Sequence, residues 1–341
     1  MLSSWQDGVN PGPQIDGKCP ILETILARAA FTAAPAYASL EEGLFALFGV
    51  RQQVAPGDLP VAALTRALDV GLPDAGWWLR ADPVHLRISR DRLILIDALQ
   101  LDISQDEADQ LVAIILKVFA ADGWMLEATR PQRWYLKPAQ IPEMTTTALF
   151  DTVGRDIHPR LPQGRDGKIW RSALNEIQIL LHTASVNVER EKNGKLPINS
   201  VWFWGGGQLP RPKPVSWAQV WSTDSLCRAL AHLAGIPEEP TPPGFDSWQR
   251  RASQPGEHLV LLDDGLHAWR YGDQEQRLDF MQRLERDWLT PLLRALKNNT
   301  IASVTLLTDG GQEYSLTPGQ ARRWWRVRRA LSSYADKLLR Q

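Results

Sequence analysis

Carboxylate and imidazole side chains that follow predicted buried strands are the first residues in this sequence to suggest chemistry. Asp263 and His267 stand four residues apart after the apolar run 258–262, and Asp309 follows a second run, 303–308. Ligands bind at the carboxyl ends of strands in open α/β sheets, so these side chains are placed to hold a divalent cation. The set is incomplete for a catalytic metal centre, and the alternative is that both aspartates cap turns or helices.

The stretch 170–210 carries a second polar pattern. Its helical spacing puts Asn175, Gln178 and His182 on one face and apolar residues on another, and a polar loop then leads to an aromatic strand at 201–204. Three glycines end that strand, where backbone can take positive φ or approach a ligand closely. The glycines match neither a P-loop nor a dinucleotide-binding motif, because Pro210 and the prolines after it prevent a helix there.

Candidate nucleophiles are scarce. Ser39 is a candidate, but its spacing to Glu42 already has the form of a helix capping box. Cys227 lies in a predicted apolar helix, where a buried thiol is inert.

The strongest local charge cluster is 322–329, in which arginines alternate with Trp324, Trp325 and Val327. Such a segment could hold single-stranded nucleic acid or rest on an anionic membrane. The alternative is an amphipathic helix over 318–340 whose Trp325, Leu331 and Leu338 pack while the arginines stay solvated. We favour the helix, because the formal net charge of the whole chain is only -1.

Bulk properties are those of an ordinary globular protein. No continuous apolar segment reads as a signal peptide or a bilayer span, and the two cysteines do not form a disulfide framework, so we expect a cytoplasmic protein. Residues 1–20 are predicted to be poorly ordered.

The elements that must position these residues alternate in type. Helices are expected at 21–30, 39–48, 60–69, after Ser104, at 170–182, 224–234 and 274–297. Strands are expected at 78–81, 93–96, 124–128 and 133–136, besides those already named. We predict an α/β fold with a mostly parallel central sheet and crossover helices: a single domain over 21–341 with a smaller α+β subdomain or insertion at about 77–165.

The sequence resembles a family whose members share these motifs. The whole chain resembles the RpfE-type regulatory proteins of proteobacteria, most specifically in the segments 175–178 and 202–207. More remotely it is similar to archaeal-type cofactor-independent phosphoglycerate mutases of the alkaline phosphatase superfamily. Their Asn-x-x-Arg, Pro-x-Asn and Trp-x-Trp-Gly-x-Gly runs correspond here to Asn187 with Arg190, to Pro197 with Asn199, and to the segment 202–207.

The resemblance implies an alkaline-phosphatase-like fold and a set of site residues. It implies ligand binding by Asn175, Asn187, Arg190, Asn199, Trp202, Gly205 and Gly207, with Arg190 as the partner of a phosphate or carboxylate. It also implies Zn or Mn at Asp263, His267 and Asp309, although Gly310 stands where the family has a second histidine. Ser39 lies one residue from the position of the mutase nucleophile, and no strand-end Asp precedes it at 21–34.

The leading hypothesis is therefore a catalytically degenerate relative with a regulatory or binding role, whose partner is a small anion or a protein. The first alternative is an active metal-dependent phosphatase or phosphomutase. The second is an interaction module that works through the Arg/Trp helix, although nucleic acid and membrane are not the expected partners because the whole-chain charge is balanced.

Overall fold

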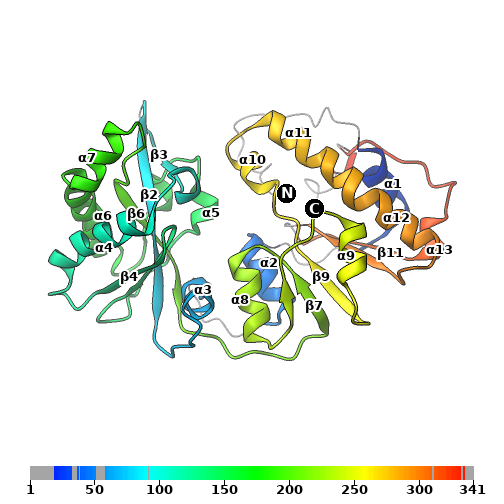
Figure 1. Cartoon of the computed structure of the whole chain (residues 1–341), viewed down its shortest axis with the longest axis horizontal. Coiled ribbons are helices and arrows are strands. Elements are labelled where there is room, and N and C mark those ends of the chain that lie inside the picture. Colours follow the sequence, from blue (N-terminus) through cyan, green and yellow to red (C-terminus); the bar gives the residue numbers. More distant parts are fainter. Residues whose placement is uncertain are drawn as a thin grey trace. The chain divides into compact units, whose positions relative to one another are not determined.

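The computed structural model of the protein describes residues 19–32, 37, 39–50, 58–90, 92–308, 311–331 and 333–334, and only the backbone of His267 and Arg270. Most of the predicted lead-in 1–20 lies outside these residues. The chain divides into two compact units (Figure 1). The first unit comprises Met1–Leu47, Ser216–Cys227 and Ile236–Gln341, and the second unit comprises Phe48–Val215 and Arg228–Gly235.

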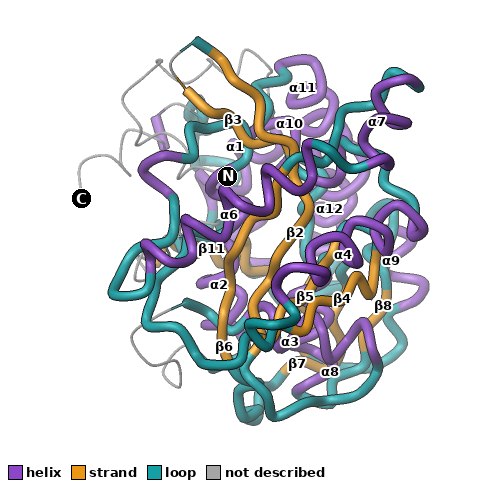
Figure 2. The backbone as a smooth tube through the Cα atoms, turned by 90° about the vertical axis from the view of Figure 1, so that its left-hand side faces the viewer, coloured by secondary structure: helices purple, strands orange, loops and turns teal. Residues whose placement is uncertain are grey.

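The second unit is built on a five-stranded antiparallel sheet. Its strands are β2 (Trp78–Ser89), β3 (Arg92–Ile96), β4 (Met125–Arg130), β5 (Arg133–Lys137) and β6 (Ser200–Gly207). The path β3-β2-β5-β4 is completed by β6, which pairs with β2 from Val84↔Ser200 to Trp78↔Gly207 and runs beside it in Figure 2. Strand β2 is therefore the centre of this unit.

Helices cover both faces of this sheet. They are α3 (Val61–Val70), the 3-10 turn η3 (Ala98–Gln100), α4 (Gln105–Phe119), α5 (Leu149–Thr152), the 3-10 turn η4 (His158–Arg160), α6 (Gly167–His182) and α7 (Ser185–Lys192). Figure 1 shows α4 and α6 on one side and α3 on the other. Because successive strand residues point to opposite faces, Leu79 of β2 joins the α4–α6 core while Trp78 packs with Ala62 of α3.

Helix α4 shows how the sequence starts an element. The Ser104 hydroxyl accepts the Glu107 amide N–H at 3.2 Å, and the Glu107 carboxylate accepts the Ser104 amide N–H at 2.8 Å, which is the predicted capping box. Leu111 and Ile115 are then buried against the sheet. The predicted helix is confirmed.

The first unit contains two small sheets. Strands β1 (Ala30–Thr32), β10 (Val304–Leu307) and β11 (Glu313–Leu316) form an antiparallel sheet in the order β1-β11-β10. Strands β7 (Trp217–Trp221), β8 (Glu238–Glu239) and β9 (Glu257–Val260) form a parallel sheet in the order β8-β7-β9. The carboxyl end of the parallel sheet is the edge that the sequence marks for ligand binding.

The helices of the first unit pack around separate apolar clusters. They are α1 (Pro20–Arg28), α2 (Leu40–Leu47), α9 (Phe245–Arg251), α10 (Leu266–Arg270), α11 (Gln274–Arg283), the π-helix η5 (Leu284–Leu289), α12 (Thr290–Lys297) and α13 (Pro318–Ala321); α8 (Ser225–Leu233) begins in this unit. Ile25, Leu293 and Leu316 belong to one of these clusters.

The α/β class is confirmed, but a mostly parallel central sheet is not. Strand and helix periodicity does not encode strand direction, and several strands here are joined by short turns. The β2–β3, β4–β5 and β10–β11 pairs are hairpins, which are antiparallel by construction. Parallel pairing occurs in the β8-β7-β9 sheet, where whole helices separate the strands.

Two further elements differ from expectation. The helix predicted over 318–340 is wrong for its described first half, because α13 ends at Ala321 and residues 322–330 form turns and irregular backbone. The rest of the prediction, including Leu338, lies largely outside the described residues. Helix α7 was not predicted, since its polar sequence lacks apolar periodicity. Within the part of the chain that the structure describes, no helix is long and apolar enough to cross a bilayer.

Candidate functional site

The loops at the carboxyl end of the β8-β7-β9 sheet are tied together by hydrogen bonds. The Ser222 amide N–H donates to the Glu239 carbonyl at 2.9 Å, and the Leu261 amide N–H donates to the Trp221 carbonyl at 2.9 Å. The Thr241 hydroxyl donates to the Leu261 carbonyl at 3.1 Å. Side chains that follow the parallel strands are therefore held beside one another.

Asp224 and Asp263 place two carboxylates at this edge. The pKa of Asp263 is raised to about 6, first by burial and then by the negative charges of Asp224 and Asp264. Asp224 accepts the Cys227 amide N–H at 2.8 Å and its own amide donates to the Ser222 hydroxyl at 3.0 Å. The negative charge of Asp224 beside Asp263 favours the arrival of a cation, and oxygen ligands suit hard divalent ions.

Cys227 lies at the start of α8 beside these carboxylates. Its thiol is fully buried, and its pKa is raised to about 12 by burial and by the charges of Asp224, Asp263 and Glu238, while the Ser222 hydroxyl lowers it. A thiol with so high a pKa stays protonated near neutral pH, so Cys227 is inert as a nucleophile, as the sequence indicated.

Of the three predicted metal ligands, only Asp263 has a described side chain. Asp263 follows β9 as expected, and the next turn packs closely, since a Cβ on Gly265 would lie 2.6 Å from the Phe280 ring. His267 lies in α10 with its backbone alone described, and Asp309 lies outside the described residues. Among the described side chains, no three His, Cys, Asp or Glu converge on one metal position.

Asp224 is the site residue that sequence reasoning missed. The signal was present, because Ser222 to Asp224 follow an aromatic, β-branched run at 217–221 just as Asp263 follows its strand. Recognising that run as a strand would have placed Asp224 at the same edge.

Ser39, the candidate nucleophile, begins α2 in the first unit. Its hydroxyl accepts the Glu42 amide N–H at 3.2 Å, so this side chain satisfies a free backbone donor of the helix.

Asn187 and Arg190 lie in α7 of the second unit, and both are buried. The Asn187 amide nitrogen donates to the carbonyls of Leu181 and Ile198, at 2.7 and 2.9 Å, and its oxygen accepts the Ile198 amide N–H at 2.8 Å. The side chain thus joins the end of α6 to the segment that enters β6.

The Arg190 guanidinium makes four hydrogen bonds to protein groups. It donates to the carbonyls of Leu196 at 2.9 Å, Asp102 at 3.4 Å and Leu101, and it pairs with the Glu107 carboxylate at 2.9 Å. These contacts give Arg190 a structural role that links α7 to the start of α4. Binding of an anion by Arg190 stays a prediction.

The remaining predicted ligand residues are distributed along the same unit. Asn199 brackets the backbone of Leu86, accepting its amide N–H at 2.7 Å and donating to its carbonyl at 3.0 Å. The buried Trp202 indole donates to the Thr147 carbonyl at 2.9 Å, while Asn175 is exposed on α6. The predicted anion group therefore belongs to the second unit and Asp263 to the first.

The triple glycine serves close packing around β6. Gly205 has φ of 66°, a backbone conformation that L side chains rarely adopt. A Cβ on Gly207 would lie 2.6 Å from the Cβ of Pro60 at the start of α3. Both glycines let α3 approach the strand.

A buried ion pair within β2, which also contacts α3, was not predicted from the sequence. The Arg80 guanidinium donates to the Asp82 carboxylate at 2.7 and 2.9 Å, and to the Thr65 hydroxyl at 3.3 Å. Asp82 also accepts the Trp204 indole N–H at 2.7 Å. With each charge partnered, this cluster fixes the α3 face of the sheet.

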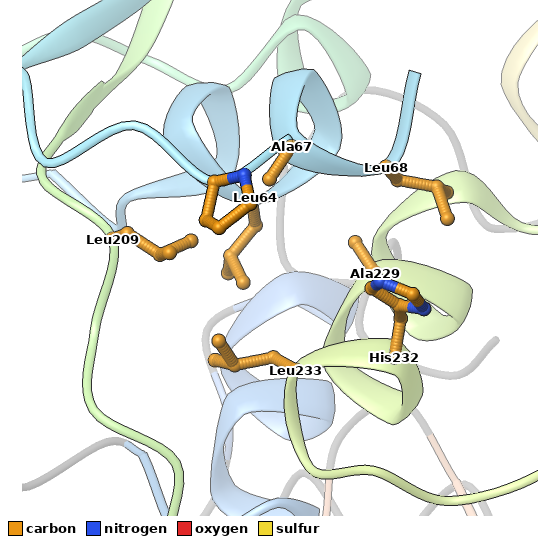
Figure 3. A pocket seen from close by; sticks show the side chains of 8 residues that line it. Leu64, Ala67, Leu68, Leu209, Ala229, His232 and Leu233 are labelled. Atoms are coloured by element: carbon orange, nitrogen blue, oxygen red, sulfur yellow. The ribbon is translucent and has the colours of Figure 1, made fainter. Parts of the chain in front are cut away.

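The second unit also contains a cavity of about 220 Å³ between α3 and the second half of α8 (Figure 3). Its lining is formed by Leu64, Ala67, Leu68, Pro73, Leu209, Ala229, His232 and Leu233. Apart from the His232 imidazole the wall is apolar, so this cavity does not share the chemistry of the carboxylate edge.

Comparison of sequences relates the chain remotely to cofactor-independent phosphoglycerate mutases. No protein-family model matches the sequence. A 2,3-bisphosphoglycerate-independent phosphoglycerate mutase of Methanosarcina acetivorans is 34% identical over 172 residues, which cover 45% of this chain and 42% of that protein. A probable enzyme of the same name from Geobacter sulfurreducens is 27% identical over 159 residues, covering 46% and 39%. The protein from Methanosarcina mazei is 35% identical over 69 residues, covering 20% and 17%.

These matches span less than half the length of the curated relatives. Two solved structures align with most of this chain. A cofactor-independent phosphoglycerate mutase from Thermoplasma acidophilum aligns at a TM-score of 0.42 and 16% identity, covering 98% of this chain and 90% of that one. The PH0037 protein of Pyrococcus horikoshii aligns at a TM-score of 0.49 and 14% identity, covering 88% and 79%.

Proposed function

We propose that this chain is a phosphoglycerate-mutase-like binding or regulatory protein that takes up a divalent cation at the carboxyl end of its β8-β7-β9 sheet. The observation that carries the proposal is the pair of carboxylates Asp224 and Asp263 at this edge: burial and then repulsion by the charge of Asp224 raise the pKa of Asp263 to about 6. A bound cation would neutralise this repulsion. The sequence similarity to phosphoglycerate mutases supports a phosphate-bearing anion as the second ligand.

The chain's own residues fit such a cation in type. Asp224 and Asp263 offer carboxylate oxygens, and the sequence spacing adds His267 and Asp309 as further ligands. A bound Zn or Mn would supply a Lewis acid for a phosphate oxygen. The hydrogen bonds of Ser222 and Thr241 to neighbouring backbone keep the strand-end loops in place around the carboxylates.

Two features favour binding over turnover. Gly310 stands at the position where the resembled family has a metal-binding histidine. Ser39 uses its hydroxyl to accept the Glu42 amide N–H, whereas a phosphoenzyme mechanism needs that oxygen activated by a metal or a base.

The second candidate is an active metal-dependent phosphatase or phosphomutase. It is favoured by the retained Asp263-to-His267 spacing and by the names of the relatives. Under this reading Ser39 would attack phosphate, and loss of either Ser39 or His267 would abolish turnover.

Measurement of cation binding tests the proposal against the alternative that the protein binds no metal ion. Mn and Zn would be titrated into the metal-free protein by calorimetry, with elemental analysis after dialysis. We expect Asp263→Asn to weaken binding by more than about tenfold, since loss of even an outer-shell partner costs that much. The control is Asp246→Asn, an exposed carboxyl on α9 of the same unit, which should bind like the wild type. No cation uptake by the wild type, or equal affinity in the Asp263 variant, would sink the proposal.

A turnover assay then separates the two candidates. The cation-loaded protein would be incubated with phosphoglycerate and with an aryl phosphate. Binding without turnover supports the regulatory reading, whereas turnover that disappears in His267→Ala and Ser39→Ala would establish the enzyme.

A further inference from the structure

The segment from Arg322 to Arg329, here called the Arg-Trp segment, leaves the end of α13 as irregular backbone. Its base is anchored to the first unit. The Arg322 guanidinium donates to the Lys297 carbonyl at the end of α12, at 3.0 Å from Nε, and Arg28 of α1 donates to the Ala321 carbonyl at 2.6 Å. Figure 1 shows the segment as the orange-red trace beyond α13.

Large apolar side chains stand in solvent along this segment. The exposed fractions are 82% for Trp324, 61% for Trp325 and 82% for Val327. The expectation that Trp325 packs into the protein is therefore wrong, and the reason for reading the segment as a buried helix face is removed. Exposed apolar residues gathered in one short segment mark an interaction site.

The charges around these side chains are all of one sign. Arg323, Arg326, Arg328 and Arg329 alternate with the apolar residues, and the sequence from 314 to 335 contains no Asp or Glu. Because the whole chain carries a formal charge of -1, this segment is a local cationic surface on a nearly neutral protein. A partner that matches this surface must carry negative charge and must also accept apolar side chains.

We propose that the Arg-Trp segment attaches the protein to the surface of an anionic lipid bilayer. Tryptophan rings and Val327 enter the boundary between headgroups and acyl chains, while the arginines contact lipid phosphates. Such attachment lies on the bilayer and needs no spanning helix.

Single-stranded nucleic acid fits the same charges less well. It would stack its bases on tryptophan faces, but Val327 has no aromatic face and would stay in water. The rings of Trp324 and Trp325 also meet edge to face, at 87° with centroids 6.1 Å apart, so they do not form a parallel stacking platform.

The test is cosedimentation of the full chain with vesicles of phosphatidylcholine alone or with about one third phosphatidylserine. We expect binding to the anionic vesicles only, weakening as salt is raised. Each basic residue near such a surface contributes about fivefold, so the double variant Arg326→Gln and Arg328→Gln should bind about 25-fold more weakly. The double variant Trp324→Ser and Trp325→Ser should lose binding without any change of charge.

A matched control removes the same charge elsewhere. Lys117→Gln with Lys168→Gln changes two exposed lysines of the second unit and should leave binding unchanged. Unfolding midpoints should agree among all variants, because the substituted side chains are exposed. Equal binding to neutral vesicles, or insensitivity to the substitutions in the segment, would overturn the proposal. If the segment bound oligothymidylate but not vesicles, its partner would be single-stranded nucleic acid and the bilayer proposal would be wrong.

Discussion

Asn187 and Asn175 contrast the two roles that an asparagine on a helix can take. Asn187 is buried and makes three hydrogen bonds to backbone groups of Leu181 and Ile198, whereas Asn175 is exposed. Replacing Asn187 by Ala removes these three hydrogen bonds, each worth about 1 kcal/mol. We therefore expect Asn187→Ala to lower the free energy of unfolding by about 3 kcal/mol, measured by urea denaturation.

The control for that measurement is Asn175→Ala, whose effect should stay within about 0.5 kcal/mol because the side chain is exposed. If the two variants had equal urea midpoints, the hydrogen bonds of Asn187 to backbone groups would not stabilise the protein. A ligand role for Asn187 would then deserve priority over its structural one.

Two aspartates of the second unit should affect stability with opposite pH dependence. Burial raises the pKa of Asp58 above 3.8, against hydrogen bonds from Thr146 and Gly206. Hydrogen bonds from the Gly76 amide and the Trp78 indole, together with the charges of Lys137 and Arg66, hold the pKa of Asp74 below 3.8.

Between 3.8 and its raised folded pKa, Asp58 holds a proton in the folded state that the unfolded chain lacks, so stability falls as pH rises there. For Asp74 the unfolded chain holds the extra proton, so its contribution is present above pH 3.8 and is lost as pH falls through the folded pKa. Urea midpoints of Asp58→Asn and Asp74→Asn from pH 3 to 7 would check the signs, since each variant removes its own slope. Slopes of the same sign would contradict the assignment.

At the scale of elements, the start of α4 depends on one side chain. Ser104 accepts the Glu107 amide N–H, and the capping box is complete. Ser104→Ala should destabilise the protein by about 1 kcal/mol. Ser172→Ala, an exposed serine inside α6, should be neutral or stabilising by a few tenths of a kcal/mol, because alanine is the better helix former. The stabilities of the two variants would be compared by thermal denaturation. An equal loss of stability in both would show that the Ser104 cap does not stabilise the helix.

Elements with strong local signals could be predicted from the sequence. The capping box and apolar spacing of α4, and the two strands around Arg130 and Arg133, were predicted within a few residues. Helix α7 could not be predicted, because it is held by the tertiary bonds of Asn187 and Arg190 and carries no apolar stripe. The segment after Ala321 was wrongly predicted as helix, since arginine and alanine favour helices locally but no packing completes one.

The candidate site was predicted in part for a similar reason. Asp263 was found because it follows an apolar run, and Asp224 was missed because β7 had not been recognised. Residues such as Arg190 and Asn199 look alike in sequence whether they bind a ligand or bracket backbone. Only their hydrogen bonds show the second role: Arg190 donates to the Leu196 carbonyl, and Asn199 donates to the Leu86 carbonyl.

At the scale of the whole molecule, the chain passes between two units that have separate cores. Leu111 lies in the core formed by the five-stranded sheet with α4 and α6, while Leu293 lies in the cluster of α1, α12 and β11. Because neither cluster contains residues of the other unit, damage to one core should loosen mainly the unit that contains it.

Two matched substitutions test this independence. Leu111→Ala and Leu293→Ala each remove a buried leucine side chain, and each should cost about 2 to 5 kcal/mol. Native-state hydrogen exchange, followed by mass spectrometry of peptides, should show faster exchange in the second unit for Leu111→Ala and in the first unit for Leu293→Ala. Peptides of the other unit should keep their wild-type rates, because their own hydrogen bonds and core are unchanged. Faster exchange across both units in either variant would show that the chain unfolds as one cooperative body. A local cation site in the first unit would then be coupled to the sheet of the second through global stability.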